Sequence, residues 1–135
     1  MATAAFLIAG AALAQTNWLT IAGIPGDASA DYVQLDPTKL AKESGLVTIA
    51  VRVSRSRERT SQDGIRFRSF VGIAGVDCRQ MTARFLRASF YREPNFEGPP
   101  FLTKEYGSVI RPVMFREIPG DHAKQTVRAA CAAVK

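Results

Sequence analysis

Arginine is the residue type that dominates the chemistry this sequence could perform. The stretch SRSRERTSQDGIRFR, residues 54–68, holds five arginines in fifteen positions, and another arginine stands just before it. Guanidinium groups bind phosphate, sulfate and carboxylate through paired hydrogen bonds. One set of side chains is therefore the candidate anion-binding or partner-binding site: Arg52, Arg55, Arg57, Arg59, Arg66 and Arg68. The plain alternative is a solvated hairpin that keeps a sheet edge from pairing with other chains.

Residue types that serve catalysis or metal binding are few. The single histidine, His122, has no base or acid next to it, and no H-E-x-x-H, G-x-S-x-G, P-loop or C-x-x-C motif occurs. The sequence thus predicts no catalytic residue, no metal site and no cofactor. An enzyme of unrecognised mechanism stays a third hypothesis and would need carboxylates that the fold brings together. The candidates are Asp31, Asp36, Asp63 and Asp77.

The first residues indicate where the protein acts. Residues 4–14 form an unbroken run of apolar and small side chains that ends in Ala-Leu-Ala. This pattern is typical of a signal peptide with an A-x-A cleavage site, and the run is far shorter than the roughly 20 apolar residues that span a bilayer. We therefore expect a signal peptide over residues 1–14, a single domain over residues 15–135, export to the periplasm or cell surface, and no transmembrane span.

The cysteines agree with an exported protein. An oxidising compartment lets disulfides persist, so Cys78 and Cys131 are expected to form one disulfide bond. If the chain stayed in the cytoplasm, its apolar N-terminal run would be a buried helix and both cysteines would be free thiols.

Composition and charge give the second function hypothesis. The chain has 47% hydrophobic residues and a net charge of +6, which is typical of a folded, basic protein. An intracellular nucleic-acid-binding domain would use the arginines on phosphates and aromatic rings as stacking platforms. The rings available near the arginines are Phe67, Phe70, Phe85 and Phe90. Their spacing is also what sheet packing produces, and no nucleic-acid-binding signature is present.

Alternating hydrophobicity predicts the strands that must position these residues. The clearest alternation is LVTIAVRVS at 46–54, and an Asp-Gly turn at 63–64 joins it to a second strand at 65–78. This second strand is apolar on both faces, so we expect it to be central and covered on both sides. In the strand after it, Leu86, Ala88 and Phe90 are expected to share a face with Arg84. Asp36-Pro37 predicts a turn after a brief strand. Further strands are expected at 16–23, 31–35, 101–106 and 113–116.

The C-terminal segment changes to helical spacing. In GDHAKQTVRAACAAVK, apolar side chains recur at positions 123, 127, 130, 131 and 134. The predicted fold is therefore α+β: an antiparallel sheet of five or six strands, with a C-terminal helix packed on one face and disulfide-linked to the sheet. The other face is partly apolar, which makes it a candidate homodimer interface or ligand groove.

Several stretches together resemble the surface-adhesin protein E family of Gram-negative bacteria. They are DYVQLDPTKL at 31–40, VDC at 76–78, RFLRASFYREPNFEG at 84–98 and REIPGDHAKQTVRAAC at 116–131. The resemblance implies an antiparallel sheet tied to a C-terminal helix by a disulfide between Cys78 and Cys131. It also implies a non-enzymatic binding protein that contacts host matrix proteins or anionic envelope or polysaccharide partners. The arginine-rich hairpin is the expected contact surface.

Overall fold

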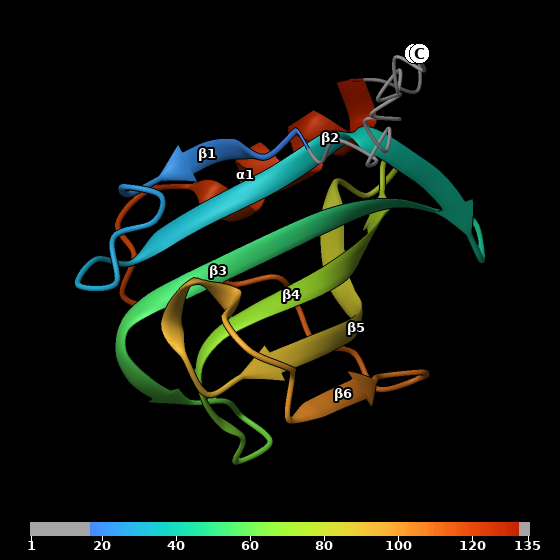
Figure 1. Cartoon of the computed structure of the whole chain (residues 1–135). Helices are drawn as coiled ribbons and strands as arrows, with labels where there is room; N and C mark the ends of the chain where they lie inside the picture. Colours follow the sequence, from blue (N-terminus) through green and yellow to red (C-terminus); the bar gives the residue numbers. More distant parts are fainter. Residues whose placement is uncertain (1–16, 133–135) are drawn as a thin grey trace, which may run out of the picture.

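Six antiparallel strands, each paired with its neighbours in sequence, form the sheet in the order β1-β2-β3-β4-β5-β6 (Figure 1). The computed structural model describes residues 17–132, so the predicted signal peptide at residues 1–14 lies outside the described residues. The strands are β1 (Leu19–Ala22), β2 (Tyr32–Glu43), β3 (Leu46–Thr60), β4 (Arg66–Asp77), β5 (Thr82–Tyr91) and β6 (Leu102–Glu105). A 3-10 turn, η1 (Pro94–Phe96), follows β5, and the helix α1 (His122–Ala132) ends the described chain.

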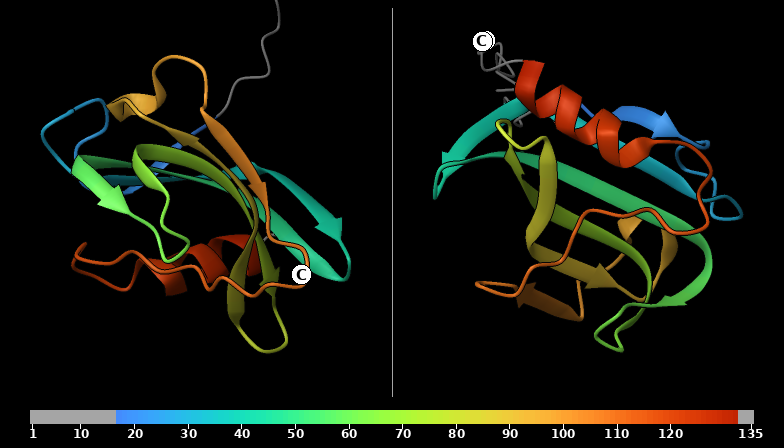
Figure 2. Two further views of the ribbon diagram at one scale, coloured as in Figure 1. Left: turned by 90° about the horizontal axis from the view of Figure 1, so that it is seen from below. Right: turned by 180° about the vertical axis from the view of Figure 1, so that it is seen from behind.

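The helix and the segment that leads into it lie on the same side of the curved sheet (Figure 2). The helix contacts β1 to β5, while residues 107–121 run across the same side of the sheet from β6 back to the helix. The predicted α+β fold, with six strands and one C-terminal helix, is confirmed. Within residues 17–132, none of the helical segments has the length and apolar character that a membrane crossing requires.

The main core lies between the helix and the first strands. Strand alternation turns Val51 and Val53 of β3 toward α1, where Val127 and Ala130 meet them, and all four side chains are almost completely buried. Burial of one such aliphatic side chain stabilises the fold by about 1.5–3 kcal/mol. This core fixes β3, and therefore the start of the arginine-rich segment.

The opposite face of the sheet is only half covered. Strand β4 is central, as predicted, but Val71 and Ile73 on that face are half-buried, so the expectation of full cover on both faces is wrong. Polar side chains gather near them: Gln34 donates from Nε2 to Thr20 Oγ1 at 3.0 Å, and Arg52 donates from Nε to Gln34 Oε1 at 2.6 Å.

Two predicted features at the strand ends are wrong. No turn occurs at Asp36-Pro37, because β2 continues through an irregularity in its pairing with β3 between Asp36 and Ala41. There the Asp36 carboxylate accepts hydrogen bonds from the Thr38 amide at 3.0 Å and from its hydroxyl at 2.5 Å. Residues 113–116 do not form a strand, and the chain just before them makes only one isolated bridge to the sheet, between Arg84 and Pro112.

The predicted disulfide joins the sheet to the helix. Cys78 directly follows β4 and Cys131 lies in the last turn of α1, with 5.6 Å between their Cα atoms. The bond therefore closes a loop that contains β5, β6 and the whole of residues 107–121.

Candidate functional site

The arginine-rich segment is one strand and one tight turn. β3 runs to Thr60, and the predicted Asp-Gly turn follows it, with Gly64 at a φ of 78° that suits glycine. The hydroxyl of Ser61 accepts hydrogen bonds from the amides of Asp63 at 3.2 Å and Ile65 at 3.1 Å. The Ser61 side chain thus fixes the turn that places the arginines at one end of the molecule.

A bulge in β3 decides where the arginines point. The pairing of β3 with β4 shifts between Ser54 and Arg59, so four residues of β3 face a single residue of β4. Arg68 lies opposite this bulge, and its guanidinium donates to the carbonyl oxygens of Arg55 at 3.1 Å, Ala28 at 2.9 Å and Ser56 at 3.3 Å. It replaces the backbone donors that the bulge removes, which is a structural role.

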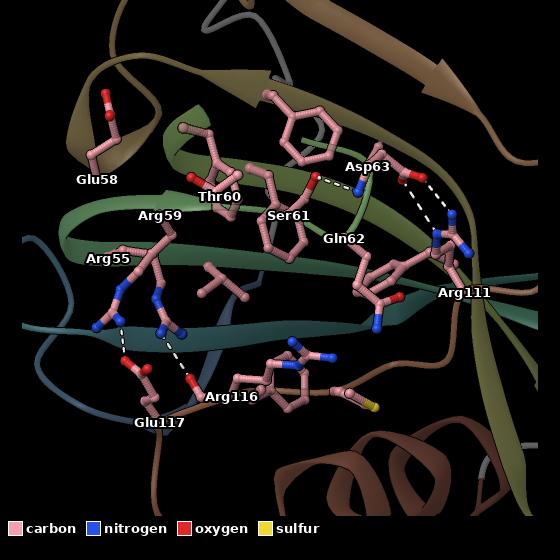
Figure 3. Close-up of a pocket in the computed structure, with 18 of the residues that line it drawn as sticks. Arg55, Glu58, Arg59, Thr60, Ser61, Gln62, Asp63, Arg111, Arg116 and Glu117 are labelled. Carbon is pink, nitrogen blue, oxygen red and sulfur yellow. Dashed lines mark hydrogen bonds and ion pairs between the residues drawn. The ribbon is translucent and has the colours of Figure 1, made fainter. Parts of the chain in front are cut away.

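Arg55 and Arg59 turn inward and are held by carboxylates. Arg55 lies 3.6 Å from Asp31 and donates to the carbonyl oxygen of Arg116 at 2.7 Å. Arg59 is 3.8 Å from Asp31 and forms a close ion pair with Glu117 (Figure 3). Burial lowers the pKa of the Arg55 guanidinium, and the Asp31 carboxylate opposes that effect. Arg59 lowers the pKa of Glu117.

The exposed arginines of the segment are Arg57 and Arg66. Their side chains are 73% and 70% exposed. Arg57 lies 3.7 Å from Glu117, a carboxylate that already pairs closely with Arg59, and Arg66 pairs with Glu58 on the hairpin surface at 2.7 Å. Ion pairs between exposed groups of this kind are weak, so a stronger anionic partner can displace them.

Arg52 lies on the other face of the sheet, away from the rest. Its guanidinium carbon is 4.3 Å from the ring centre of Trp18 and 4.7 Å from that of Phe96. This cation–π arrangement holds β1 and η1 against β3. The six predicted site residues therefore do not form one patch: Arg55, Arg57 and Arg59 come together, Arg66 lies next to them, and Arg52 and Arg68 hold the fold.

A cavity of about 480 Å³ opens beneath the hairpin, and the sequence did not predict it (Figure 3). Its floor is aromatic, because Phe67, Phe70, Phe85 and Phe90 meet there in edge-to-face and tilted pairs, with ring centres 5.3–5.9 Å apart. Tyr106 also lines it. Residues from β3, the β3–β4 turn and the segment 111–117 form the rim.

A register shift brings Phe85 into the cavity. Ile73 pairs with Arg87 but Ala74 pairs with Phe85, so Leu86 is the extra residue of a bulge in β5. The prediction that Leu86 shares a face with Ala88 and Phe90 is therefore wrong. The Phe85 ring lies over Gly72, where an added Cβ would stand 3.1 Å from it.

The segment after β6 forms the second wall of the cavity. Its backbone is bound to β5, since Phe85 donates to the Arg111 carbonyl at 2.8 Å and Val113 donates to the Ala83 carbonyl at 3.0 Å. Arg111 also forms a close ion pair with Asp63 in the β3–β4 turn, which joins the two sides of the rim. The Arg111 guanidinium lowers the pKa of Asp63 and that carboxylate in turn raises the pKa of Arg111.

The single histidine does not line this site. His122 lies elsewhere, with Nε2 2.7 Å from the Pro119 carbonyl oxygen and Nδ1 2.6 Å from Gln125 Oε1, so both ring nitrogens have structural partners. Among residues 17–132, no group of three metal-ligating side chains lies close enough to hold an ion. Burial raises the pKa of Tyr106, and the Asp63 carboxylate adds to this, which keeps the phenol protonated.

Comparison with protein families gives one match. The family model for surface-adhesin protein E matches residues 18–132, which is nearly the whole of the described chain. No curated protein and no solved structure matches the chain.

Proposed function

The chain belongs to the surface-adhesin protein E family, and we propose that it is an exported, non-enzymatic binding protein that contacts an anionic partner through the end of the β3–β4 hairpin. The observation that carries this proposal is the exposure of Arg57 and Arg66 on a chain with a net charge of +6. Arg55 and Arg59 support the surface from beneath, because their pairs with Asp31 and Glu117 hold the strand that presents Arg57.

The partner classes that fit this surface share negative charge. Two exposed guanidinium groups suit sulfate or phosphate groups of an envelope polysaccharide, or an acidic segment of a host matrix protein. A homodimer through the half-covered face that carries Val71 and Ile73 belongs to the same proposal, since that face leaves the hairpin end free.

Burial of the aromatic rings argues against the nucleic-acid hypothesis. Phe67 and Phe90 are buried in the cavity floor and pack against other rings, so they offer no exposed platform on which bases could stack. These two rings are therefore unavailable for base stacking beside the exposed arginines.

The binding proposal is tested by retention on a heparin column, where heparin represents sulfated polymers. The double variant Arg57→Ser/Arg66→Ser should elute at clearly lower salt than the parent protein, because two exposed charges near the contact are lost. The matched control is Arg79→Ser/Arg128→Ser, which removes two other exposed arginines and the same net charge. Equal elution of both double variants would mean that net charge alone explains retention, and would overturn the proposed surface.

Export has its own test. Cell fractionation with mapping of the mature N-terminus should find the protein outside the cytoplasm and beginning after Ala14. A cytoplasmic protein that retains Met1 would contradict export and favour the nucleic-acid hypothesis instead.

A further inference from the structure

We propose that the cavity beneath the hairpin is a binding site for a small amphiphile with an apolar body and one anionic head, of the fatty-carboxylate class. This ligand differs from the macromolecular partner proposed above because its apolar body is bound inside the protein, although both ligands would contact Arg57. The inference is carried by an aromatic floor, a rim with excess positive charge and an opening between them.

The floor accepts an apolar body. Small-molecule sites have volumes of about 300–1,000 Å³ and mostly apolar linings with a few polar groups, and the cavity of about 480 Å³ falls within this range. Val53, Ala88 and the ring edges of Phe70 and Phe85 offer only carbon atoms to an occupant. Transfer of an alkyl chain from water into contact with these apolar groups supplies the free energy of binding.

The rim selects for negative charge. Five arginines line the cavity against three carboxylates, which leaves 5 − 3 = +2. Three of the arginines are engaged: Arg55 and Arg59 by the carboxylates of Asp31 and Glu117, and Arg111 by Asp63.

Two rim guanidinium groups remain available to an anionic head. Arg57 has only its 3.7 Å contact with Glu117, and Arg116 forms no ion pair within residues 17–132. Arg116 directly precedes Glu117, the residue that Arg57 contacts, and both arginines line the cavity. A single carboxylate placed there gains charge-assisted hydrogen bonds without breaking the inner pairs.

The opening of the cavity lies between the apolar floor and the positively charged rim. Arg57 is 73% exposed and Met114 is 47% exposed, and both line the cavity. Met114 is flexible and apolar, so it can pack on the part of an alkyl chain that emerges from the floor. An amphiphile would thus place its chain on the phenylalanines, pass Met114 and leave its head at Arg57 and Arg116.

The proposal is tested by calorimetric titration of the protein with dodecanoate below its critical micelle concentration. Saturable one-to-one binding is expected. Dodecyltrimethylammonium, with the same chain and the opposite charge, should bind at least about tenfold more weakly, which corresponds to 1.4 kcal/mol. Acetate, which has the head without the chain, should give no saturable signal. Equal binding of the two dodecyl compounds would overturn the anionic preference, and absence of dodecanoate binding would overturn the site.

A matched pair of variants locates the binding. Met114→Glu adds a negative charge at the opening and should weaken dodecanoate binding by about fivefold or more, from repulsion of the head at short range. Met81→Glu makes the same change at a methionine of similar exposure, 52%, in the β4–β5 turn away from the cavity, and should leave the affinity unchanged. Both positions are exposed, so thermal unfolding should show that each variant folds. Equal effects of the two variants would place the ligand elsewhere.

The two proposals fail separately. If dodecanoate does not bind while heparin retention still depends on Arg57 and Arg66, only the cavity site is overturned. If dodecanoate binds and responds to Met114→Glu while both arginine double variants elute together from heparin, only the proposed hairpin surface is overturned.

Discussion

The environment of each hairpin arginine cannot be predicted from its neighbours in the sequence. Arg55 and Arg57 are both preceded by a serine, yet Arg55 is buried beside Asp31 and Arg57 extends into solvent. The bulge in β3 breaks the simple alternation of strand faces, so neighbouring arginines meet different carboxylates. Truncation of Arg55 would leave Asp31 with one cationic partner fewer in a partly buried place, whereas truncation of Arg57 removes a solvated charge.

The Asp63–Arg111 pair makes stability depend on pH. Because Arg111 holds the pKa of Asp63 below the ordinary value of about 3.9, Asp63 stabilises the folded protein at pH values above that ordinary value. This contribution is lost as the pH falls through the lowered pKa of the folded state. The variant Asp63→Asn should therefore be less stable than the parent protein in urea at pH 7. The difference should shrink below about pH 4.

The control for this comparison is Glu97→Gln. Glu97 is an exposed side chain after η1 with no ion pair among the described residues. The Glu97→Gln variant should therefore be as stable as the parent protein at each pH. A stability difference for Asp63→Asn that stays constant between neutral and acidic pH would contradict a role for the ionised carboxylate.

At the scale of elements, the sequence predicted where strands lie better than where they end or shift. The alternation of Val47, Ile49, Val51 and Val53 located the middle of β3 because each apolar side chain faces the core. The bulges at Ser54–Arg59 and at Leu86 depend on contacts with other strands, so no local pattern signals them. For the same reason the position of Phe85 in the cavity could not be predicted.

The wall formed by residues 107–121 was beyond sequence reasoning for a different physical reason. The sequence predicts a strand at 113–116, but the segment forms no such strand. Its position depends on the hydrogen bonds that Arg111 and Val113 make with β5 and on the ion pair with Asp63. Two signals were present in the sequence: an arginine flanked by Ile110 and Pro112, and a phenylalanine-rich pair of strands. Neither signal indicates that the segment around Arg111 contacts these strands in the folded protein.

Two glycines before β2 differ in one respect that a substitution can measure. Gly23 and Gly26 have φ angles of 77° and 83°, so an alanine is strained at either position. A Cβ at Gly23 would also lie 2.0 Å from the carbonyl oxygen of Asp31, whereas at Gly26 it would meet nothing within 4 Å. Gly23→Ala should therefore lower the free energy of unfolding by about 2–3 kcal/mol more than Gly26→Ala does.

Chemical denaturation of the two glycine variants measures this difference. Because Asp31 holds Arg55 and Arg59, Gly23→Ala should also disturb the arginine end of β3, which a change in heparin retention would report. Equal losses of stability in the two variants would show that the chain between β1 and β2 moves aside without cost, contrary to the close approach in the structure.

At the scale of the whole molecule, the disulfide stabilises the cavity wall as well as the helix. The sequence separation of Cys78 and Cys131 is 53, and a loop of this length gives about 4 kcal/mol in the chain-entropy model. Residues 107–121 lie inside that loop.

Reduction of the disulfide, or the variant Cys78→Ser/Cys131→Ser, should lower the melting temperature markedly and weaken ligand binding in the cavity. Thermal unfolding with and without reductant measures this, with alkylation to confirm the thiol state. An unchanged melting temperature in fully reduced protein would contradict it.

The strand order has a consequence for how the chain reaches its fold. Since each strand pairs only with its sequence neighbours, the sheet can grow one hairpin at a time as the chain emerges, with short loops to close and little search. Cys131 follows every strand in the sequence, so its bond with Cys78 can form only after all six strands have been synthesised. The meander is therefore compatible with a folding order in which the hairpins form first, the helix packs next and the disulfide bond forms last.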